Sequence, residues 1–461
     1  MSTIVEQLQA ALGPDGVLTG NDARNRSGAW GVPQCEALCV LRPASTAEVA
    51  AALRICHAAG QAVVTEGGKT GLVSGTKAAA SEIALSLERM NRIERVDARG
   101  RTMTVQAGAT LQAVHEAAEA EGLIMPLDLG ARGSATIGGN IATNAGGNGV
   151  IRYGMMREQV LGLEVVLADG TVLSSLNQVL KNNTGYDLKQ LFIGSEGTLG
   201  VITRAVLRLR PLMPARNSAL VATDSIEHLI TLLTFIEREL GGRMSAFEAM
   251  WNSYYRIACR GPQLGEPPLA DTHAFYVLIE SAGADMSADA ERFLAALEQA
   301  MEQGLVSDAV LAQSEKEREA FWKIRDNIES MAALWPLVIF DISLPVAEMG
   351  DYLARCAARI EQLLGELRWV TFGHLGDGNL HLAVATGTDA AARKRGVEEI
   401  VYGELAGIGG SISAEHGIGL DKRDFLGISR NPVEIGLMRT LKHALDPDDL
   451  LNPGVLLPPR T

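Results

Sequence analysis

Two histidines flank a short turn in the segment HLGDGNLH, which runs from His374 to His381. The central pair Asp377-Gly378 predicts a two-residue hairpin turn, because both residue types tolerate positive φ. In such a hairpin His374 and His381 are direct cross-strand neighbours on one face, with Cβ atoms about 5 Å apart. The flanking strands are apolar, so two adjacent imidazoles are a poor choice for a core and a good clamp for a divalent metal ion. A purely structural histidine pair is the alternative.

A carboxylate can complete this metal site. Glu415 lies in SAEHGIG, after a Gly409-Gly410 bend, and a set of two histidines and one carboxylate leaves coordination positions open for substrate oxygens. We expect zinc first and manganese or iron second, with the ion acting as a Lewis acid on a substrate hydroxyl. His416 points the opposite way in an extended chain, which frees it from coordination and suits it as a general base.

Two glycine-rich segments predict a cofactor that carries phosphate. The first, TEGGKTGLVSGT (65–76), follows an apolar strand, and its glycines let successive backbone N–H groups converge on an anion. The second, GSATIGGNIATNAGGN (133–148), combines glycines, asparagines and small hydroxyl residues, so planar and phosphate groups can approach the backbone. Glycine-rich turns of an ordinary α/β protein are the alternative.

Neither segment matches a common nucleotide-binding motif. Gly68-Lys69-Thr70 has the end of a Walker A loop, but the required earlier glycine would fall at Val63, inside the strand. A G-x-G-x-x-G that opens a helix is also missing from the sequence, which disfavours a nicotinamide cofactor in a Rossmann fold.

The first half of the chain alternates helix-like and strand-like segments. Ser45 or Thr46 caps a predicted helix in STAEVAAALRICHAAG, which is followed by the strand QAVVT. Between the glycine-rich segments, ALSLERM (84–90) and TMTVQAG (102–108) are predicted as two strands around a polar turn. This rhythm indicates an α/β layer.

The second half begins near residue 212. After Arg210-Pro211 glycine becomes rarer, and two long helices are predicted in SIEHLITLLTFIEREL and SADAERFLAALEQAMEQG. A second, α+β domain therefore starts there.

Composition excludes several classes of protein. The 461 residues, 47% hydrophobic and 21% charged, suit two or three folded domains. The net charge of −14 disfavours nucleic acid as a partner. Without a signal peptide or a run of 18 apolar residues, we expect a cytoplasmic protein with no integral membrane segment. Five scattered cysteines without C-x-x-C predict reduced thiols rather than disulfides or a cysteine zinc site.

From about residue 40 to residue 457, the chain resembles FAD-linked oxidases of the vanillyl-alcohol oxidase type, in the branch of D-lactate and D-2-hydroxyglutarate dehydrogenases. The matching motifs are PLDLG, IGGNIATNAGG, GSEGTLGVIT, GHLGDGNLH, AEHGIG and LLNPG. The resemblance implies an α+β protein with a two-part FAD-binding domain (1–212), a substrate and metal domain with an antiparallel sheet (213–409), and a small helical C-terminal segment (410–461) that completes the active site.

The resemblance also implies how FAD is held. In the resembling family, members that tether FAD covalently use a histidine at the loop position where this chain has Lys69, or a cysteine further on. This chain has neither, so we expect FAD to be bound non-covalently. The implied FAD-binding residues are Glu66, Gly67, Gly68, Lys69, Thr70, Gly71, Pro126, Asp128, Gly138, Gly139, Asn140, Thr143, Asn144, Gly146, Glu196, Ile202 and Asn452.

The implied reaction is oxidation of a D-2-hydroxy acid to the 2-oxo acid. In the resembling family the histidine at His416 is the base, and the arginine at Arg325 pairs with the substrate carboxylate through its guanidinium fork. A helix-surface salt bridge between Arg325 and Glu329 is the alternative. The C2 hydride then passes to FAD.

The substrate stays open between D-lactate and D-2-hydroxyglutarate. In the resembling family, members specific for the diacid have a lysine where this chain has Ile339, and often an asparagine where it has Ala383. Lys323 or Arg423 could replace the missing polar contacts to the second carboxylate. The electron acceptor is an electron-transfer flavoprotein, a quinone or a cytochrome, and a homodimer is the default expectation. A covalent-flavin oxidase of the same fold and a non-catalytic flavoprotein subunit are the rival functions.

Overall fold

The computed structural model describes residues 3–26, 36–260, 266–388 and 390–459. The chain forms two compact units, each described by itself. Unit 1 contains residues 1–147, 154–212 and 415–461, and unit 2 contains residues 148–153 and 213–414. The chain thus leaves unit 1 after Leu212 and returns to it at Glu415.

Unit 1 has two main sheets. The first is mixed, in the order β1-β2-β4-β3, with parallel pairing of β4 to both β2 and β3; its strands are β1 (Val17–Leu18), β2 (Cys39–Leu41), β3 (Val63–Glu66) and β4 (Ile83–Ser86). The second is antiparallel, in the order β5-β6-β10-β8-β9; its strands are β5 (Ile93–Asp97), β6 (Thr102–Gln106), β8 (Val160–Val166), β9 (Val172–Ser175) and β10 (Val201–Arg208). A short pair joins β7 (Leu123–Ile124) and β11 (Arg210–Pro211).

One expectation for this region is wrong. The segments predicted as two strands around a polar turn form β4 and β6, which belong to different sheets. The residues between them are not only a turn, because they form β5, which pairs with β6. The period-2 pattern identified the strands but could not say which strand each of them pairs with.

Helix α3 of unit 1 starts at the predicted cap. Ser45 Oγ accepts a hydrogen bond from the Glu48 backbone N–H (3.2 Å) and caps α3, as expected from the sequence. The helices are α1 (Ile4–Leu12), α2 (Gly20–Arg24), α3 (Thr46–Ala58), α4 (Leu111–Glu119), α5 (Ile137–Ala142), α7 (Met156–Gln159), α8 (Lys189–Phe192), α15 (Leu426–Ser429) and α16 (Pro432–Leu445), with 3-10 turns η1 (Pro14–Gly16) and η5 (Arg423–Phe425).

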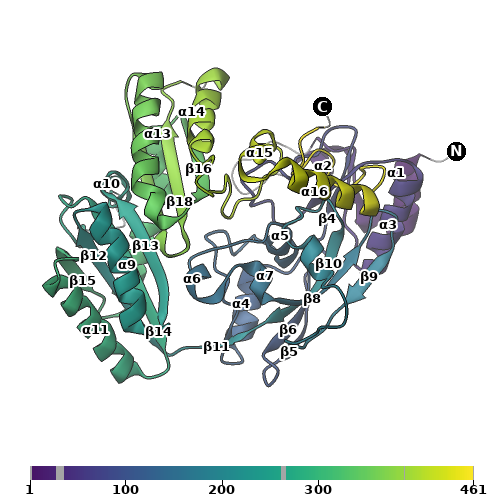
Figure 1. Ribbon diagram of the computed structural model, residues 1–461. Helices are drawn as coiled ribbons and strands as arrows, with labels where there is room; N and C mark the ends of the chain where they lie inside the picture. Colours follow the sequence, from purple (N-terminus) through teal and green to yellow (C-terminus); the bar gives the residue numbers. More distant parts are fainter. Residues whose placement is uncertain (1–2, 27–35, 261–265, 389, 460–461) are drawn as a thin grey trace. The chain divides into compact units, whose positions relative to one another are not determined.

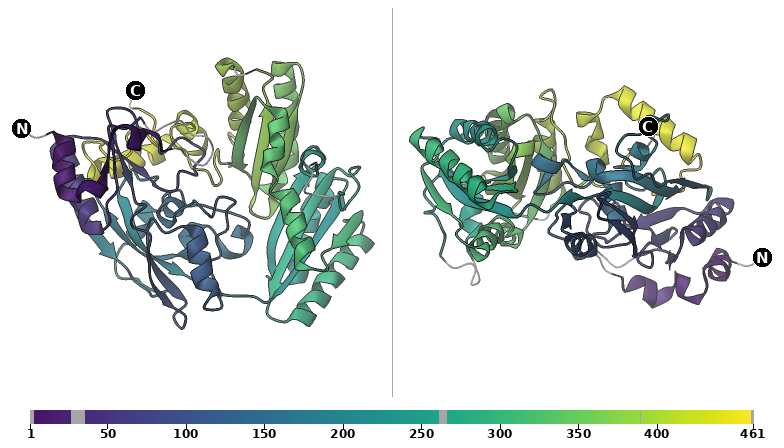
Figure 2. Two further views of the ribbon diagram at one scale, coloured as in Figure 1. Left: turned by 180° about the vertical axis from the view of Figure 1, so that it is seen from behind. Right: turned by 90° about the horizontal axis from the view of Figure 1, so that it is seen from below.

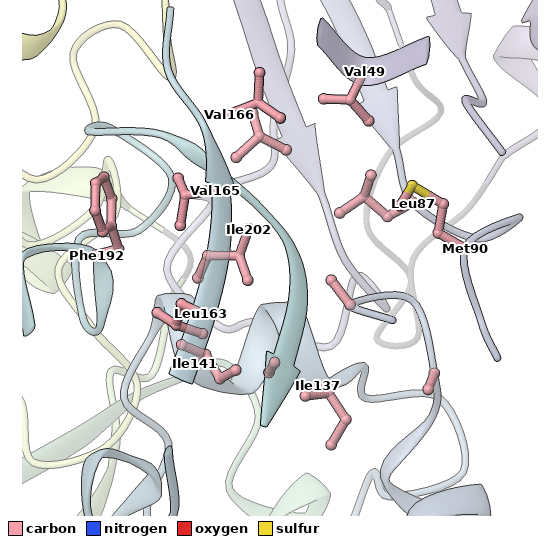
Figure 3. Packing of buried hydrophobic residues seen from close by; sticks show 14 of the residues in the cluster. Val49, Leu87, Met90, Ile137, Ile141, Leu163, Val165, Val166, Phe192 and Ile202 are labelled. Atoms are coloured by element: carbon pink, nitrogen blue, oxygen red, sulfur yellow. The ribbon is translucent and has the colours of Figure 1, made fainter. Parts of the chain in front are cut away.

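An apolar core joins the parts of unit 1 (Figure 3). Val49 of α3, Ile137 and Ile141 of α5, and Leu163 and Val165 of β8 belong to one buried cluster. Leu451, from the C-terminal segment, is buried in the same cluster, and Figures 1 and 2 draw this segment, in yellow, among the other elements of the unit. The core therefore fixes the glycine-rich loops that leave these elements.

Unit 2 is built on one antiparallel seven-stranded sheet among the described residues, in the order β15-β12-β14-β13-β17-β18-β16. The strands are β12 (Ala215–Thr223), β13 (Met244–Trp251), β14 (Phe275–Gly283), β15 (Asp308–Leu311), β16 (Leu337–Ser343), β17 (Trp369–His374) and β18 (Asn379–Ala385). The predicted α+β class with an antiparallel sheet in the second domain is confirmed.

Helices cover this sheet (Figure 1). The two long helices predicted after residue 212 form as α9, capped by Ser225, and α11. The helices are α6 (Val150–Tyr153), α9 (Ile226–Leu240), α10 (Asn252–Ala258), α11 (Met286–Glu302), α12 (Glu315–Arg325), α13 (Met349–Leu364) and α14 (Ala391–Gly403), with 3-10 turns η2 (Ile328–Leu334), η3 (Val346–Glu348) and η4 (Leu375–Asp377).

The helices and cysteines bear on two further expectations. Over the ranges that the structure describes, every helix is too short or too polar to cross a lipid bilayer. The four described cysteines, Cys39, Cys56, Cys259 and Cys356, are free thiols, as expected, and Cys35 lies outside the described residues.

Candidate active site

Unit 1 encloses a cavity of about 530 Å³. Both glycine-rich loops, the residues after β4 and the C-terminal segment contribute to its wall. The predicted FAD-binding residues in the wall are Glu66, Gly67, Gly68, Lys69, Gly71, Gly138, Gly139, Thr143, Glu196, Ile202 and Asn452, and His416 lies there as well. The cavity therefore brings together residues as far apart in the sequence as Arg26 and Asn452, which are 426 positions apart.

The two glycine-rich loops touch through their backbones. A Cβ added to Gly68 would lie 1.9 Å from the Ser134 carbonyl oxygen, and one added to Gly67 would lie 2.8 Å from Thr136 Oγ1. Only glycine allows this approach, because any side chain would separate the loops. The resulting wall of backbone groups suits a phosphate-bearing, planar cofactor.

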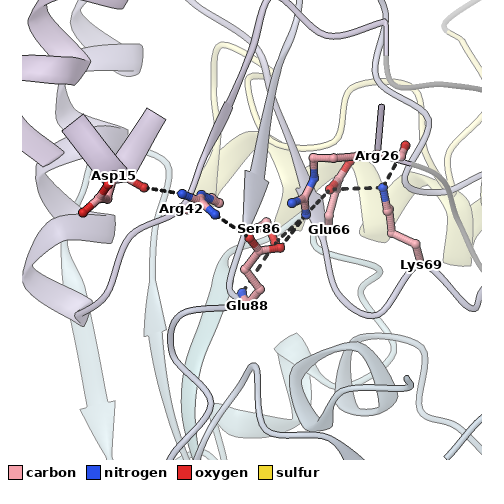
Figure 4. A network of polar contacts seen from close by, with 7 residues as sticks. All are labelled: Asp15, Arg26, Arg42, Glu66, Lys69, Ser86 and Glu88. Carbon is pink, nitrogen blue, oxygen red and sulfur yellow. Dashed lines mark hydrogen bonds and ion pairs between the residues drawn. The ribbon is translucent and has the colours of Figure 1, made fainter. Parts of the chain in front are cut away.

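Four residues of the cavity wall, Arg26, Glu66, Lys69 and Glu88, belong to one network of charged side chains (Figure 4). Glu66 Oε2 lies 3.7 Å from Arg26 Nη2 and 3.9 Å from Lys69 Nζ, and Arg26 also pairs with Glu88 at 2.6 Å. Burial raises the pKa of Glu66, and the charges of Lys69 and Arg26 lower it in part. Arg26 and Lys69 place two cationic side chains in the wall, where they are paired with Glu66 and Glu88.

The sequence does not identify Arg26 as a site residue, although Arg26 lines the cavity. It follows the five-residue helix α2, and the segment around it has no motif or periodicity that points to a ligand. Its place in the wall depends on tertiary contacts with Glu66, Ser86 and Glu88.

Glu196 anchors the loop that carries His416. Its carboxylate accepts hydrogen bonds from the backbone N–H groups of Ile418 (2.7 Å) and Gly419 (2.8 Å). Asn452 in turn donates to the Glu196 carbonyl oxygen (2.8 Å) and accepts from the Thr65 N–H (2.8 Å). Burial raises the pKa of Glu196, whereas its two backbone hydrogen bonds lower it. These bonds tie the first glycine-rich loop, the C-terminal turn and the His416 loop together.

Six residues predicted to bind FAD lie outside the wall of this cavity: Thr70, Pro126, Asp128, Asn140, Asn144 and Gly146. Asp128 forms an ion pair with Arg132 (3.2 Å), and the Asn144 side chain accepts a hydrogen bond from the Arg157 N–H (2.9 Å). Gly146 packs against Glu415, because an added Cβ would lie 2.5 Å from Glu415 Oε1. Both of these residues belong to unit 1.

In unit 2, His374 ends β17 and His381 lies in β18, and their rings meet. The ring centroids are 5.4 Å apart and the planes are nearly perpendicular, at 81°. Both residues are buried. Two imidazoles at this separation on one sheet face can bind one ion.

The predicted register of this hairpin is wrong by two residues. His381 pairs directly with Phe372, not with His374. Only Gly378 takes the left-handed conformation (φ +82°), while Leu375–Asp377 form a 3-10 turn that is closed by the Gly378 N–H to the Leu375 carbonyl (3.2 Å). The loop is therefore longer than a two-residue turn. Because a shift of two residues preserves the side-chain face, the histidines still meet, as diagonal neighbours.

Each imidazole has a buried carboxylate on an adjoining strand. Glu248 of β13 pairs with His374, and its oxygen lies 2.8 Å from His374 Nδ1. Asp341 of β16 pairs with His381, and its Oδ1 lies 3.8 Å from His381 Nδ1. Burial raises the pKa of Glu248, but His374 and Arg325 outweigh it, so this pKa lies below its usual value.

Neither carboxylate was predicted from the sequence. Glu248 is one glutamate within the otherwise apolar strand MSAFEAMW, which was not assigned to the site. An isolated acidic residue in a strand signals burial with a partner, but the sequence does not identify that partner.

Arg325 lies at the end of α12 and is almost fully buried. Its Nε donates to Glu248 Oε2 (2.8 Å), and its Nη2 lies 3.3 Å from His374 Nε2. Its guanidinium also lies over the Phe372 ring, 5.0 Å from the centroid. The carboxylate partner is therefore Glu248 rather than Glu329, and Arg325 stands beside the histidine pair.

Comparisons with known proteins identify the family of this chain. Residues 37–175 match the FAD binding domain family, and residues 212–456 match the C-terminal domain of FAD linked oxidases. The second match covers more than half of the chain. The chain belongs to the FAD-linked oxidases. It is an FAD-dependent oxidoreductase with the two-domain fold of the vanillyl-alcohol oxidase type.

Three relatives of this FAD-linked oxidase are similar over nearly its whole length. D-2-hydroxyglutarate dehydrogenase of Xanthomonas citri pv. viticola is 43% identical, over 91% of this chain and 89% of that protein. Mitochondrial D-2-hydroxyglutarate dehydrogenase of Bos taurus is 43% identical, over 91% and 76%. A putative mitochondrial D-lactate dehydrogenase of Schizosaccharomyces pombe is 38% identical, over 91% and 80%.

The fold of this FAD-linked oxidase is also that of p-cresol methylhydroxylase, with a TM-score of 0.78 over 99% of this chain and 96% of that one. The sequence identity is 15%, so the likeness shows the fold alone. Since the cattle and yeast relatives are named as mitochondrial, the expected cytoplasmic location stays a prediction.

Proposed function

We propose that this protein oxidises a D-2-hydroxy acid to the 2-oxo acid, with non-covalent FAD and a divalent metal ion. The observation that carries the proposal is the buried imidazole pair of His374 and His381, 5.4 Å between centroids, in a chain of the FAD-linked oxidase family. Flavin chemistry does not require two adjacent histidines, so binding of a metal ion is the role that explains this pair.

The donor set fits a metal ion. His374 has a carboxylate at Nδ1, so its Nε2 is the nitrogen that a metal would use, as in carboxylate–histidine–zinc sites. Glu415 would supply the third ligand. It follows Ala414 directly, and the Ala414 N–H bonds to the carbonyl oxygen of Asp341, the strand partner of His381. Zinc suits nitrogen and carboxylate ligands best, with manganese or iron as the next choices.

The chain's own residues then divide the work. When bound, FAD accepts the hydride equivalent from C2, and the ion polarises the substrate hydroxyl and carboxylate as a Lewis acid. His416 would take the hydroxyl proton, and Glu196 would hold the His416 loop against the cavity through the N–H groups of Ile418 and Gly419. Arg325, the predicted partner of the substrate carboxylate, would act from beside the histidines, where its Nε is already bonded to Glu248 (2.8 Å).

The side chain of the substrate stays open between lactate and hydroxyglutarate. The similarity to the named D-2-hydroxyglutarate dehydrogenases favours the diacid. Ile339 favours the smaller acid, because it lies on the sheet face of Asp341 and is 46% exposed, so it offers an apolar rather than a cationic contact. Ala383 carries less weight, since it is fully buried in the core of unit 2.

Anaerobic bleaching of the flavin absorbance tests this function. D- and L-lactate, D- and L-2-hydroxyglutarate and longer D-2-hydroxy acids are added to the protein with and without a chelator. We expect bleaching by D-acids alone and its loss with chelator. Bleaching that is unaffected by complete metal removal, or bleaching by L-acids, contradicts the proposal.

Acid precipitation distinguishes the rival covalent-flavin oxidase. We expect the flavin to stay in the supernatant, because Lys69 occupies the loop position of the tethering histidine. A yellow pellet would favour the covalent oxidase instead. A non-catalytic flavoprotein subunit would bind FAD and fail to bleach with every acid in the panel. The electron acceptor, an electron-transfer flavoprotein, a quinone or a cytochrome, and the homodimer stay predictions.

A further inference from the structure

Four adjoining strands of unit 2 carry a row of ionisable side chains. In the sheet order β13-β17-β18-β16 these are Glu248, His374, His381 and Asp341. Each carboxylate stands directly opposite its histidine in the strand register, Glu248 to His374 and Asp341 to His381. The two imidazoles therefore form the centre of the row and the two carboxylates its ends.

The contact between Glu248 and His374 fixes the histidine's tautomer. An ionised carboxylate only accepts hydrogen bonds, so at 2.8 Å the Nδ1 of His374 must carry the proton. The lone pair then belongs to Nε2, which is the form that binds a metal ion. Arg325 donates to the other carboxylate oxygen (2.8 Å) and keeps Glu248 in place.

Asp341 stands in the same relation to His381 at a longer distance. Its Oδ1 is 3.8 Å from His381 Nδ1, beyond a normal hydrogen bond. Asn379 Nδ2 donates to Oδ1 (2.9 Å), and Ser413 Oγ donates to Oδ2 (3.3 Å), so this carboxylate is also held in place. The contact of Asp341 with the His381 ring is therefore weaker than the contact of Glu248 with the His374 ring.

A contribution to stability alone does not explain why these four ionisable side chains are buried in the sheet. Glu248 and Asp341 are 1% and 0% exposed, and the desolvation of a buried carboxylate is repaid by an ion pair only when the geometry of the pair is good. Buried ion pairs can often be replaced by apolar side chains without loss of stability. A requirement for oriented imidazoles explains why charges stand at these positions.

We infer that Glu248, held by Arg325, is a positioning residue that orients His374 for metal binding, and that Asp341 does the same more weakly for His381. The inference rests on the proposed function, because it needs the metal ion. Hydrogen-bond partners of this kind change metal affinity by about 10–100-fold when they are removed.

Metal affinity of the FAD-loaded full chain is the direct test. The dissociation constant for Zn²⁺ is measured by competition with a chromophoric chelator for wild type, Glu248→Gln and Asp341→Asn. We expect about 10–100-fold weaker binding in Glu248→Gln and a smaller loss in Asp341→Asn, with unchanged FAD content. Glu280→Gln is the matched control, since Glu280 lies in the adjoining strand β14 and pairs with Arg318, away from the histidines. Its zinc affinity should equal that of wild type.

The outcomes separate the inference from the proposed function. If wild type binds no stoichiometric Zn²⁺, Mn²⁺ or Fe²⁺, the proposed function fails. If wild type binds zinc and Glu248→Gln binds it equally well, only the positioning role is overturned. Should Glu248→Gln fail to fold, Glu248→Asp decides, because it keeps the charge for Arg325 but moves the oxygens away from Nδ1. Wild-type zinc affinity in Glu248→Asp overturns the inference, and weakened affinity supports it.

Discussion

Gly146→Ala tests whether Glu415 is a metal ligand, without changing any ligand. The added Cβ would lie 2.5 Å from Glu415 Oε1 and 3.1 Å from its Cγ, while ordinary van der Waals contact begins at 3.4 Å. The carboxylate must therefore retreat by about 0.9 Å. Metal–ligand distances vary by only about 0.2 Å, so a shift of this size would move the Glu415 oxygen out of coordination distance.

The expected loss follows from that displacement. Disturbing the geometry of one ligand should weaken metal binding by about 10–100-fold, which corresponds to about 1.4–2.7 kcal/mol. The clash involves the end of a flexible side chain, so the backbone of the loop need not move. FAD content should therefore remain that of wild type.

The assay compares metal content and metal affinity with flavin content in the same preparation. Gly133→Ala is the matched control in the same glycine-rich loop, because its added Cβ would meet nothing within 4 Å. We expect the control to bind metal and FAD as wild type does. Gly146→Ala with full metal affinity would refute the assignment of Glu415 as a ligand.

Three further predictions concern unit 1. Gly68→Ala should lose FAD, because its Cβ would lie 1.9 Å from the Ser134 carbonyl oxygen, whereas Gly133→Ala, outside the cavity wall and with nothing within 4 Å of its Cβ, should keep it; flavin absorbance per chain decides. Glu196→Gln leaves one buried N–H of the His416 loop without a carboxylate acceptor, a penalty of about 1–3 kcal/mol, so flavin reduction measured per bound FAD should slow. Glu164→Gln, a buried carboxylate away from that loop, should reduce flavin at the wild-type rate, and equal rates in both variants would contradict the role of Glu196. Burial raises the pKa of Glu164, but hydrogen bonds from Thr46 and Ser174 and the charge of Arg204 leave it below 4.5. The folded chain then binds fewer protons than the unfolded chain, so this stability is present above about pH 4.5 and is lost as the pH falls through the lowered pKa; in denaturant titrations from pH 7 to 3, Glu164→Gln should lose less stability than wild type.

The sequence by itself determined the family and named many of the residues that line the cavity. Where two backbones come into contact, as at Gly68 and Ser134, only glycine fits, so such positions can be identified from the sequence. The local pattern also placed both histidines on one sheet face. Side chains alternate between the two faces of a strand, so a register error of two residues leaves the face unchanged. The caps at Ser45 and Ser225 are local in the same sense, since each bonds to the backbone three residues ahead.

The tertiary structure alone decided the hairpin register and the partners of the histidines. The loop at Asp377-Gly378 closes as a 3-10 turn, and the two strands that it joins also pair with β13 and β16, which the two turn residues do not reveal. Glu248 reaches His374 across 126 positions of sequence, and Arg26 reaches Glu66 across 40. Such pairs form because buried charges require partners, and only the packing of distant segments determines which partner each of them finds.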